Sequence, residues 1–359
     1  MNASTEGSVS RNVSRAGSFL VPLLAGLALS FAAGCGNDEP ITPSEETVGG
    51  FPKKLLPERL LPDLPLVPPK SARDLPLFTD IVDVPAGADI TYCTYTNVIL
   101  DEPTIFGESF GAQSPQGHHA IMYYTSTPKE PYTGECGEMM EDGQMLLGGT
   151  GGKAVADEPT LPVNFGVEVP AGAQLIINHH WINTTPTDVP GQSMMLARKL
   201  DRDGNTVMAG NMIMLGFGWE LPPLSPYEFS TECKYDADVP YVLALGHMHE
   251  WGKNVRIDVT SADGSVENVI NEEWTADSAT GVGGGTVYSL DQPLTIKKGD
   301  TVKLTCQWQN TTAEPIGFPR EMCIFFGYTV DTNFFCANGT WYTAESARGA
   351  GMGDIGSHL

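Results

Sequence analysis

Short apolar segments separated by polar turns make up the chain from about residue 77 to about residue 345. They are rich in β-branched and aromatic residues, Gly, Pro and Asp-Gly pairs punctuate them, and none keeps a helical period for long. The clearest segments are ADITYCTYTNVIL, HHAIMYYTS, AQLIINHHWIN, YVLALGHMH, NVRIDVTSADG, DTVKLTCQWQN and EMCIFFGYTV. Short strands at this spacing predict an all-β fold of antiparallel sandwiches or jelly rolls rather than a parallel sheet covered by helices.

The length of this β-rich part sets the expected number of domains. Roughly 270 residues are enough for two sandwiches. The polar turn LDRDGNT at residues 200–206 is the best candidate for a junction. We therefore predict two tandem antiparallel, jelly-roll-like β-sandwich domains over residues 77–203 and 204–345, followed by a flexible tail over residues 346–359.

The N-terminus has the pattern of an export signal. Two arginines precede the uncharged run AGSFLVPLLAGLALSFAAGC, whose apolar part is short for a membrane span and ends in small residues. The terminal AAGC resembles a bacterial lipobox, which would make Cys35 the lipidated first residue of the mature protein, and Gly36 after it favours the outer membrane. We expect an exported bacterial lipoprotein with residues 1–35 as its signal. The alternative is an ordinary cleaved signal that leaves Cys35 unexplained.

Residues 36–76 have the composition of a linker. A polar stretch, GNDEPITPSEETVGG, precedes FPKKLLPERLLPDLPLVPPKS, which is dense in Pro and Leu but has neither helical nor strand periodicity. This pattern predicts a tether that lifts the folded body off the membrane.

Export changes the meaning of the cysteines. The chain has seven, and without Cys35 the other six form an even set in an oxidising compartment, which favours three disulfides over free thiols or a thiolate metal site. Six cysteines permit fifteen pairings, and spacing alone does not choose among them. The formal net charge of −24 argues against a nucleic-acid partner, since a phosphate backbone attracts Lys and Arg that this chain lacks.

The histidines are clustered. Of the seven, six occur as three tight sets, and only His358 stands alone; the sets are His118-His119, His179-His180 and His247-x-His249. Paired imidazoles are common ligands of borderline and soft transition metals, so the pattern predicts a metal site. A single pair would be equally compatible with ordinary surface or core histidines.

Strand alternation sorts two of these sets. In an extended strand His247 and His249 project to the same face, with Met248 behind, and this geometry suits one metal. The same alternation sends His179 and His180 to opposite faces of their strand, so at most one of the two is expected to be a ligand.

Adjacent His118 and His119 pose a different problem. A regular strand would point them to opposite faces, and both could reach one metal only at a strand end, a bend or a bulge. Gly117 and Pro115 immediately upstream favour such an irregularity.

Five elements of the chain, in this order, resemble the copper type II, ascorbate-dependent monooxygenases, the family of dopamine β-monooxygenase and peptidylglycine α-hydroxylating monooxygenase. The elements are GHHAIMYY, HHWIN, GHMHEWGK, CQWQN and EMCIFFGY, and the resemblance covers roughly residues 77 to 340. It implies two antiparallel β-domains that each hold one copper ion. It also implies an enzyme that hydroxylates a C–H bond with O2 and electrons from ascorbate or another one-electron donor.

The resemblance also implies the ligands, residue by residue. The first copper would be held by His118, His119 and His180, because His180 begins the His-aromatic-x-Asn element, and His179 would be spare. The second, catalytic copper would be held by His247, His249 and Met322, and a thioether is a soft ligand that favours Cu(I). The implied disulfides are Cys93–Cys136, Cys233–Cys336 and Cys306–Cys323.

Three departures from the family pattern bear on the substrate. Peptide-amidating members hold a terminal carboxylate with Arg, Asn and Tyr at positions where this chain has Leu245, Ile324 and Phe326. All three are expected on the metal-facing side of their strands, where a buried carboxylate would have no charged partner. We therefore expect an apolar or aromatic small-molecule substrate and a monomeric enzyme.

Three other functions compete with this one. A copper-binding lipoprotein for storage, scavenging or delivery would use the same imidazoles and thioether without turnover. A zinc hydrolase is less compatible, because the chain lacks an HExxH element and Met322 would be a poor zinc ligand. A structural lipoprotein with decayed sites is disfavoured by the presence of all six expected ligands. Asn178, two residues before His180, is expected to be an ordinary strand residue rather than part of the site.

Overall fold

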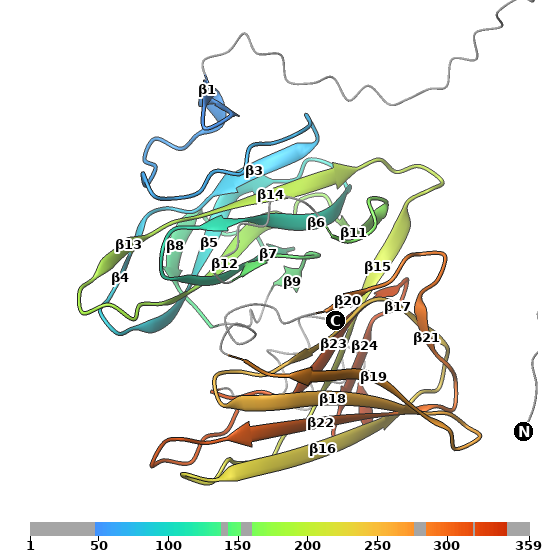
Figure 1. Cartoon of the computed structure of the whole chain (residues 1–359). Helices are drawn as coiled ribbons and strands as arrows, with labels where there is room; N and C mark the ends of the chain where they lie inside the picture. The colour runs from blue at the N-terminus through green and yellow to red at the C-terminus, as the bar shows by residue number, and fades with distance from the viewer. Residues whose placement is uncertain (1–46, 138–142, 152–159, 276–284, 319, 343–359) are drawn as a thin grey trace, which may run out of the picture. The chain divides into compact units, whose positions relative to one another are not determined.

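The computed structural model describes most of the chain after residue 46 (Figure 1). The described ranges are residues 47–137, 143–151, 160–275, 285–318 and 320–342. The predicted signal over residues 1–35 with its lipidation site Cys35, the predicted tail over residues 346–359, and His358 lie outside them. No helix in the described ranges is long and apolar enough to cross a membrane.

The described residues are almost entirely β-strands joined by turns, as the sequence predicts. The single helical turn among them is η1 (Lys53–Leu55). The strands form several largely antiparallel sheets, and two buried apolar clusters lie between pairs of facing sheets. The predicted all-β sandwich fold is therefore confirmed.

The first sandwich contains the segments with His118, His119 and His180. One sheet has the order β10-β7-β12-β5-β8, with β9 added beside β7. Its strands are β5 (Asp89–Ile99), β7 (Gly117–Thr125), β8 (Tyr132–Glu135), β9 (Gln144–Met145), β10 (Thr150–Gly151) and β12 (Gln174–Ile182). The facing strands are β3 (Asp74–Phe78), β6 (Thr104–Gln113), β11 (Phe165–Val169) and β14 (Ser193–Leu200). Side chains from both layers, such as Met122, Ile177, Phe106 and Met195, form the core between them.

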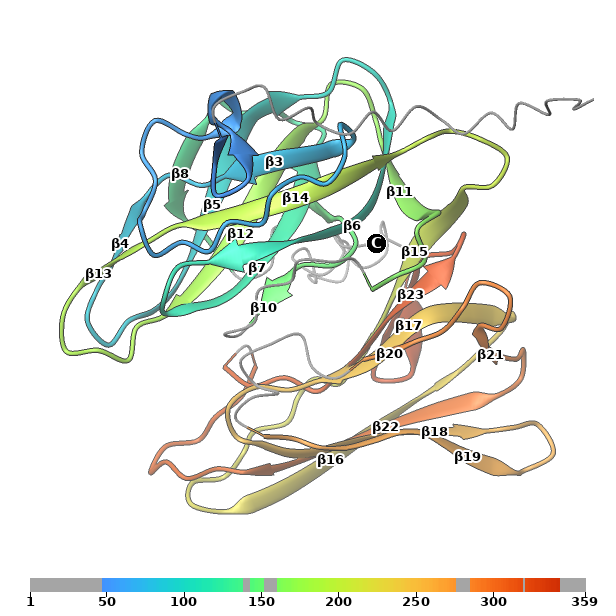
Figure 2. The ribbon, with the colours of Figure 1, turned by 45° about the horizontal axis from the view of Figure 1, so that its top comes forward.

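The second sandwich contains the segments with His247, His249 and Met322. Figure 2 shows the strands of its four-stranded sheet, ordered β16-β22-β18-β19. They are β16 (Pro226–Lys234), β18 (Gly252–Thr260), β19 (Val266–Glu273) and β22 (Thr301–Gln309). The facing strands are β15 (Val207–Leu215), β17 (Val239–His247), β20 (Thr286–Val287), β21 (Leu294–Ile296), β23 (Ile324–Val330), β24 (Phe334–Ala337) and β25 (Thr340–Tyr342).

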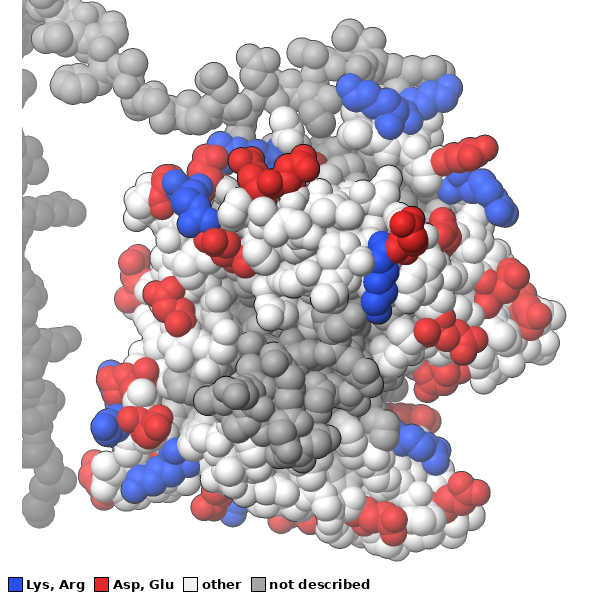
Figure 3. All heavy atoms as spheres, turned by 180° about the vertical axis from the view of Figure 1, so that it is seen from behind, with Lys and Arg blue, Asp and Glu red and all other residues white. Residues whose placement is uncertain are grey.

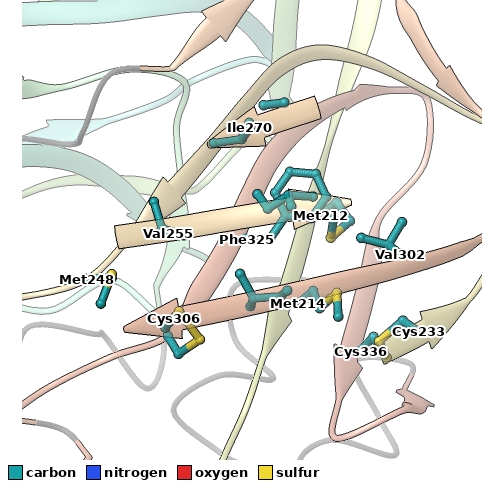
Figure 4. Close-up of a cluster of buried hydrophobic side chains, with 14 of the residues drawn as sticks. Met212, Met214, Cys233, Met248, Val255, Ile270, Val302, Cys306, Phe325 and Cys336 are labelled. Carbon is teal, nitrogen blue, oxygen red and sulfur yellow. A yellow bond between two sulfur atoms is a disulfide. The ribbon is translucent and has the colours of Figure 1, made fainter. Parts of the chain in front are cut away.

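The core of the second sandwich is large and contains several sulfur-bearing side chains. Figure 4 shows Met212, Met214 and Phe325 in it, and Met248 also belongs to this buried cluster. Met248 therefore packs into the core, behind the two histidines that flank it, as strand alternation predicts. A methionine fills irregular space well because its side chain is unbranched and flexible.

The predicted junction at residues 200–206 connects β14 to β15. β15 pairs in parallel with β11 and antiparallel with β23, so one sheet of eleven strands includes strands of both sandwiches. The boundaries of the two predicted domains stay a prediction, because a shared sheet does not by itself divide the chain.

The predicted tether differs from the structure over much of its length. β1 (Thr47–Val48) pairs with β2 (Phe51–Pro52), and Phe51, Leu64 and Val67 are buried against Phe110 and other side chains of β6 and β14. These residues belong to the folded body rather than to a linker. Their apolar side chains follow no regular period because they enter the core from turns, not from a helix or a long strand. The short strands β4 (Val82–Val84) and β13 (Val189–Gly191) form a further antiparallel pair.

Three disulfides link the described cysteines: Cys93–Cys136, Cys233–Cys336 and Cys306–Cys323. They are the three pairs that the family resemblance implies. All six cysteines are thereby paired, so no described thiolate is left for a metal. On the face shown in Figure 3, Lys and Arg side chains lie singly or in small groups among Asp and Glu side chains.

Candidate metal centre

Two neighbouring strands bring His119 and His180 together. β7 and β12 are antiparallel, and His180 is directly opposite His119 in their register. Cross-strand partners point to the same face of a sheet, so both rings lie on one side of it. Ala120 and Ile177 of the same two strands point to the other side, into the sandwich core.

His118 joins this pair through a β-bulge. The register of β7 and β12 shifts between His180 and Trp181, so that Trp181 pairs with Gly117 and His118 has no partner residue in the ladder. The extra residue turns the His118 side chain to the face that carries His119, which regular alternation would forbid. A Cβ on Gly117 would lie 2.4 Å from the Cβ of Gln113, so only glycine fits at the start of the bulge. The predicted irregularity is therefore present.

The three rings point their Nδ1 atoms at one another. His118 Nδ1 is 3.1 Å from His119 Nδ1 and 3.1 Å from His180 Nδ1. The candidate ligand atoms of the three residues all lie within 4.8 Å of one another. Two imidazole nitrogens that each lie about 2.0 Å from one metal ion, at a bond angle near 100°, are about 3.1 Å apart. The spacing therefore fits a shared metal ion.

Asp89 fixes the orientation of His180. The Nε2–H of His180 donates to Asp89 Oδ1 at 2.5 Å, so that the Nδ1 lone pair faces the other two rings. This hydrogen bond, followed by the nearby histidine charges, lowers the pKa of Asp89 even though partial burial of the carboxyl opposes the shift. A carboxylate behind a metal-binding imidazole is a common support in metal sites, because it sets the tautomer and the basicity of the ring.

The electrostatics keep His119 neutral. Burial, and then the neighbouring His180 and His118, lower the pKa of His119 well below its ordinary value. A metal ligand must offer an unprotonated nitrogen, so this environment favours metal binding over protonation.

His179 lies on the opposite face and makes a different set of contacts. Its Nδ1 accepts a hydrogen bond from Trp181 Nε1 at 2.9 Å, and its Nε2–H donates to Thr94 Oγ1 at 3.1 Å. Both ring nitrogens are therefore used, and burial lowers its pKa to about 3. His179 is a structural residue of the sandwich. Asn178 is also fully buried, and it donates from Nδ2 to the carbonyl of Gly137 at 3.0 Å.

His247 and His249 form the second cluster. Their ring centroids are 5.0 Å apart and nearly perpendicular, at 79°. The prediction that both lie in one strand is wrong in detail: β17 ends at His247, and His249 lies in the connection to β18. The turn, closed by the Gly252 N–H donating to the His249 carbonyl, brings the two rings together.

Neighbouring groups hold these two rings in place. His249 Nδ1–H donates to the carbonyl of Arg320 at 3.3 Å, which leaves Nε2 as its free lone pair. The indole Nε1–H of Trp274 donates to the His249 carbonyl at 2.9 Å, and the same indole packs edge-on against the His247 ring. Burial by surrounding protein lowers the pKa of His247 to about 3 although the residue is not wholly closed to solvent.

Met322 precedes the strand that pairs with His247. Ile324, two residues further on, begins β23 and is directly opposite His247. Met322 is buried, and its N–H and the N–H of His249 both donate to the carboxylate of Glu321. The structure thus brings the backbones of Met322 and His249 to one carboxylate. The ligand role of the thioether stays a prediction.

The three expected substrate-side residues share the face of His247. Leu245 is directly opposite Phe326, just as His247 is opposite Ile324. Ile324 and Phe326 pack against a cluster that includes Ile213 and Leu215, whereas the alternating Ala244 and Phe325 point into the sandwich core. The face beside His247 is therefore apolar and presents no described cation to a carboxylate.

Two residues of the site are not predictable from the sequence. Asp89 is 91 residues from His180, and only the pairing of β5 with β12 brings them together. Glu321 stands next to Met322 in the sequence, but nothing in the pattern shows that its carboxylate reaches back to residues 249 and 251.

Comparisons with known proteins add no assignment. A scan against protein-family models and a search of curated proteins both find no match.

Proposed function

We propose that the protein is a copper-dependent monooxygenase that hydroxylates a C–H bond of an apolar or aromatic small molecule, using O2 and a one-electron donor such as ascorbate. The observation that carries the proposal is the convergence of three Nδ1 atoms from His118, His119 and His180 at metal-ligand spacing. The second support is the pair His247 and His249, tied through one carboxylate to Met322.

The donor sets of the two clusters suit copper. Three neutral imidazoles suit an ion that changes between Cu(I) and Cu(II), and two imidazoles with a thioether favour Cu(I). When bound, copper supplies one-electron redox chemistry and the activation of O2. Ascorbate or another donor would supply the electrons.

The chain's own groups orient ligands and shape the substrate side. Asp89 and the carbonyl of Arg320 each take an imidazole N–H and so aim the opposite nitrogen of His180 or His249 at the site. Leu245, Ile324 and Phe326 give the side of His247 an apolar surface that favours a hydrocarbon or aryl group over a carboxylate. No described side chain is required as a general acid or base.

The context that we propose for this enzyme is the outer membrane of a bacterium. A lipid at Cys35 would anchor a monomeric enzyme there. This part of the proposal depends on the sequence pattern alone. A mass spectrum of the mature protein tests it, because a diacylglyceryl Cys35 adds a lipid mass that an ordinary cleaved signal lacks.

The main alternative is a copper-binding lipoprotein, and a measurement of turnover distinguishes it from the monooxygenase. Protein loaded with two equivalents of copper is supplied with ascorbate and a panel of aryl and alkyl compounds, and oxygen uptake and hydroxylated product are measured. Product formation supports the monooxygenase. Two tightly bound copper ions without product on any compound favour storage or delivery.

A panel of glycine-terminated peptides is the matched control for substrate class. We expect such peptides to stimulate little oxygen uptake, because no described cation lies on the face of Leu245 and Phe326. Equal stimulation by peptides and by apolar compounds would contradict the proposed substrate class while leaving the copper chemistry intact.

A further inference from the structure

Glu321 is a fully buried carboxylate, with 0% of its surface exposed. Three backbone N–H groups donate to it. The N–H groups of His249 and Met322 share Oε1, at 2.5 Å and 2.9 Å, and the N–H of Trp251 donates to Oε2 at 3.0 Å. Burial of a carboxylate is unfavourable unless strong hydrogen bonds compensate for the lost hydration. The three N–H donors supply this compensation.

These contacts join two segments that are far apart in the sequence. His249 is 72 residues from Glu321, and the segment around it connects β17 to β18. The carbonyl of Arg320 accepts from His249 Nδ1, and the guanidinium of Arg320 lies over the Trp251 ring at 5.5 Å. Hydrogen bonds and one cation–π contact thus join residues 320–322 to residues 249–251.

A neutral side chain also organises a loop by hydrogen bonds to the backbone elsewhere in the same sandwich. Asn310 is also fully buried, accepts the N–H of Thr312 at 2.8 Å and donates to the carbonyls of Leu221 and Glu314. A buried amide therefore suffices to organise a loop in this protein. At residue 321 three backbone N–H groups donate to two different oxygens, and a carboxylate offers two acceptor oxygens where an amide offers one.

We propose that Glu321 is a positioning residue of the second cluster: its carboxylate fixes the backbones of His249 and Met322 relative to each other, so that imidazole and thioether reach the same copper ion. This inference rests on the proposed function. Glu321 acts through its neighbours, since its oxygens are occupied by backbone N–H groups.

The test uses Glu321→Gln in the full protein, with Glu108→Gln as the matched control. Glu108 also accepts a backbone N–H, from Leu161 at 2.6 Å, but lies outside both clusters. The readouts are equilibrium titration with Cu(I) and X-ray absorption of the reduced, fully loaded protein, in which a sulfur ligand gives a distinct scattering shell. Unfolding of the copper-free protein is measured in parallel.

In Glu321→Gln we expect second-site affinity to fall about 10- to 100-fold, the usual effect of removing a group that supports a metal ligand, and the sulfur shell to weaken or lengthen. First-site affinity should not change, and Glu108→Gln should match the parent in both readouts. Glu321→Asp is the second variant: it keeps the carboxyl group, shortens the reach by one methylene, and should still weaken the sulfur shell.

A sulfur shell and a second-site affinity equal to those of the parent in both variants would overturn the proposal, even if the copper-free protein unfolds more easily. A parent protein that binds only one copper ion, or that shows no sulfur scattering, would instead overturn the proposed function. The two failures are therefore distinguishable within one set of samples.

Discussion

The two histidine clusters are built in different ways. The first is part of a sheet: His119 and His180 are cross-strand partners, and a bulge adds His118. The second cluster, His247 and His249, stands where β17 ends, and Met322, its predicted third ligand, lies on a distant segment. In the first cluster a hydrogen-bonded ladder positions the backbones, and Asp89 orients the ring of His180. The second requires added links, namely the Glu321 carboxylate and a disulfide at Cys323.

This difference suits two different tasks. In the proposed enzyme, a copper ion held by three rigidly placed imidazoles could change its oxidation state with little rearrangement of its ligands. A thioether outside the hydrogen-bonded ladder can lengthen or shorten its bond to the ion as the oxidation state of the ion changes. The comparison therefore predicts that the second cluster is the more sensitive to substitution.

Replacing the thioether should produce the largest effect. Met322→Ala is expected to lower turnover by roughly 100-fold or more, a loss larger than that of a supporting residue, while the first copper is retained. Metal analysis and product formation measure the two outcomes on one sample. Unaltered turnover would show that the ligand assignment is wrong.

The neighbouring histidines of β12 form a matched pair for the first cluster. His180→Ala should remove copper from the first cluster and leave the second occupied. His179→Ala should retain both ions but lower the free energy of unfolding by about 1–3 kcal/mol, because Trp181 Nε1 and Thr94 Oγ1 lose a buried partner. Metal analysis and urea unfolding distinguish the two variants. Loss of copper in His179→Ala would show that His179, rather than His180, is the ligand.

Removing the carboxylate behind His180 should have a moderate effect. Asp89→Asn is expected to weaken first-site copper binding about 10-fold, at the low end for such a support, because 70% of the Asp89 side chain is exposed and water can replace part of the contact. A titration with Cu(I) measures this. Second-site affinity is the internal control, and an equal fall at both sites would argue for a general change in folding instead.

The smallest predicted effect is the change in stability over the first pH unit below 6.5 in the copper-free protein. The folded-state pKa of His179 is about 3, below its ordinary value of 6.5, so the unfolded chain takes up a proton that the folded chain refuses. The free energy of unfolding should therefore fall as pH drops from 6.5 toward 3 and show no such slope above that window. His179 should contribute about 1 kcal/mol between pH 6.5 and pH 5.5. In His179→Gln the free energy of unfolding should lack this contribution and so depend less steeply on pH. The same pH dependence in the variant and the parent would contradict a lowered pKa for His179.

Local pattern predicts those parts of the site that depend on neighbours in sequence or in one strand. Alternation separates His179 from His180, and Gly117 and Pro115 before the adjacent His118 and His119 predict a strand end, a bend or a bulge, of which the structure has the bulge. The same rule fails for His249, because it assumes that the strand continues past His247. Asp89 and Glu321 act across long sequence separations, which a pattern of residues does not encode.

The predicted tether illustrates the same limit. Residues 51–67 lack periodicity, yet Phe51 and Val67 are buried, because side chains on turns can enter a core without any repeat. The all-β fold itself is predictable, since most strands are marked by composition and by the Gly and Pro residues that separate them.

The burial of the Cys306–Cys323 bridge has a consequence for the proposed enzyme, which would work with a reductant. Both sulfurs lie in residues with at most 1% exposure, so a thiolate would have no route to attack either of them in the folded chain. The bridge is therefore shielded from thiol–disulfide exchange once the chain is folded. In the proposed enzyme, a reductant that serves the metal ions would leave this cross-link intact.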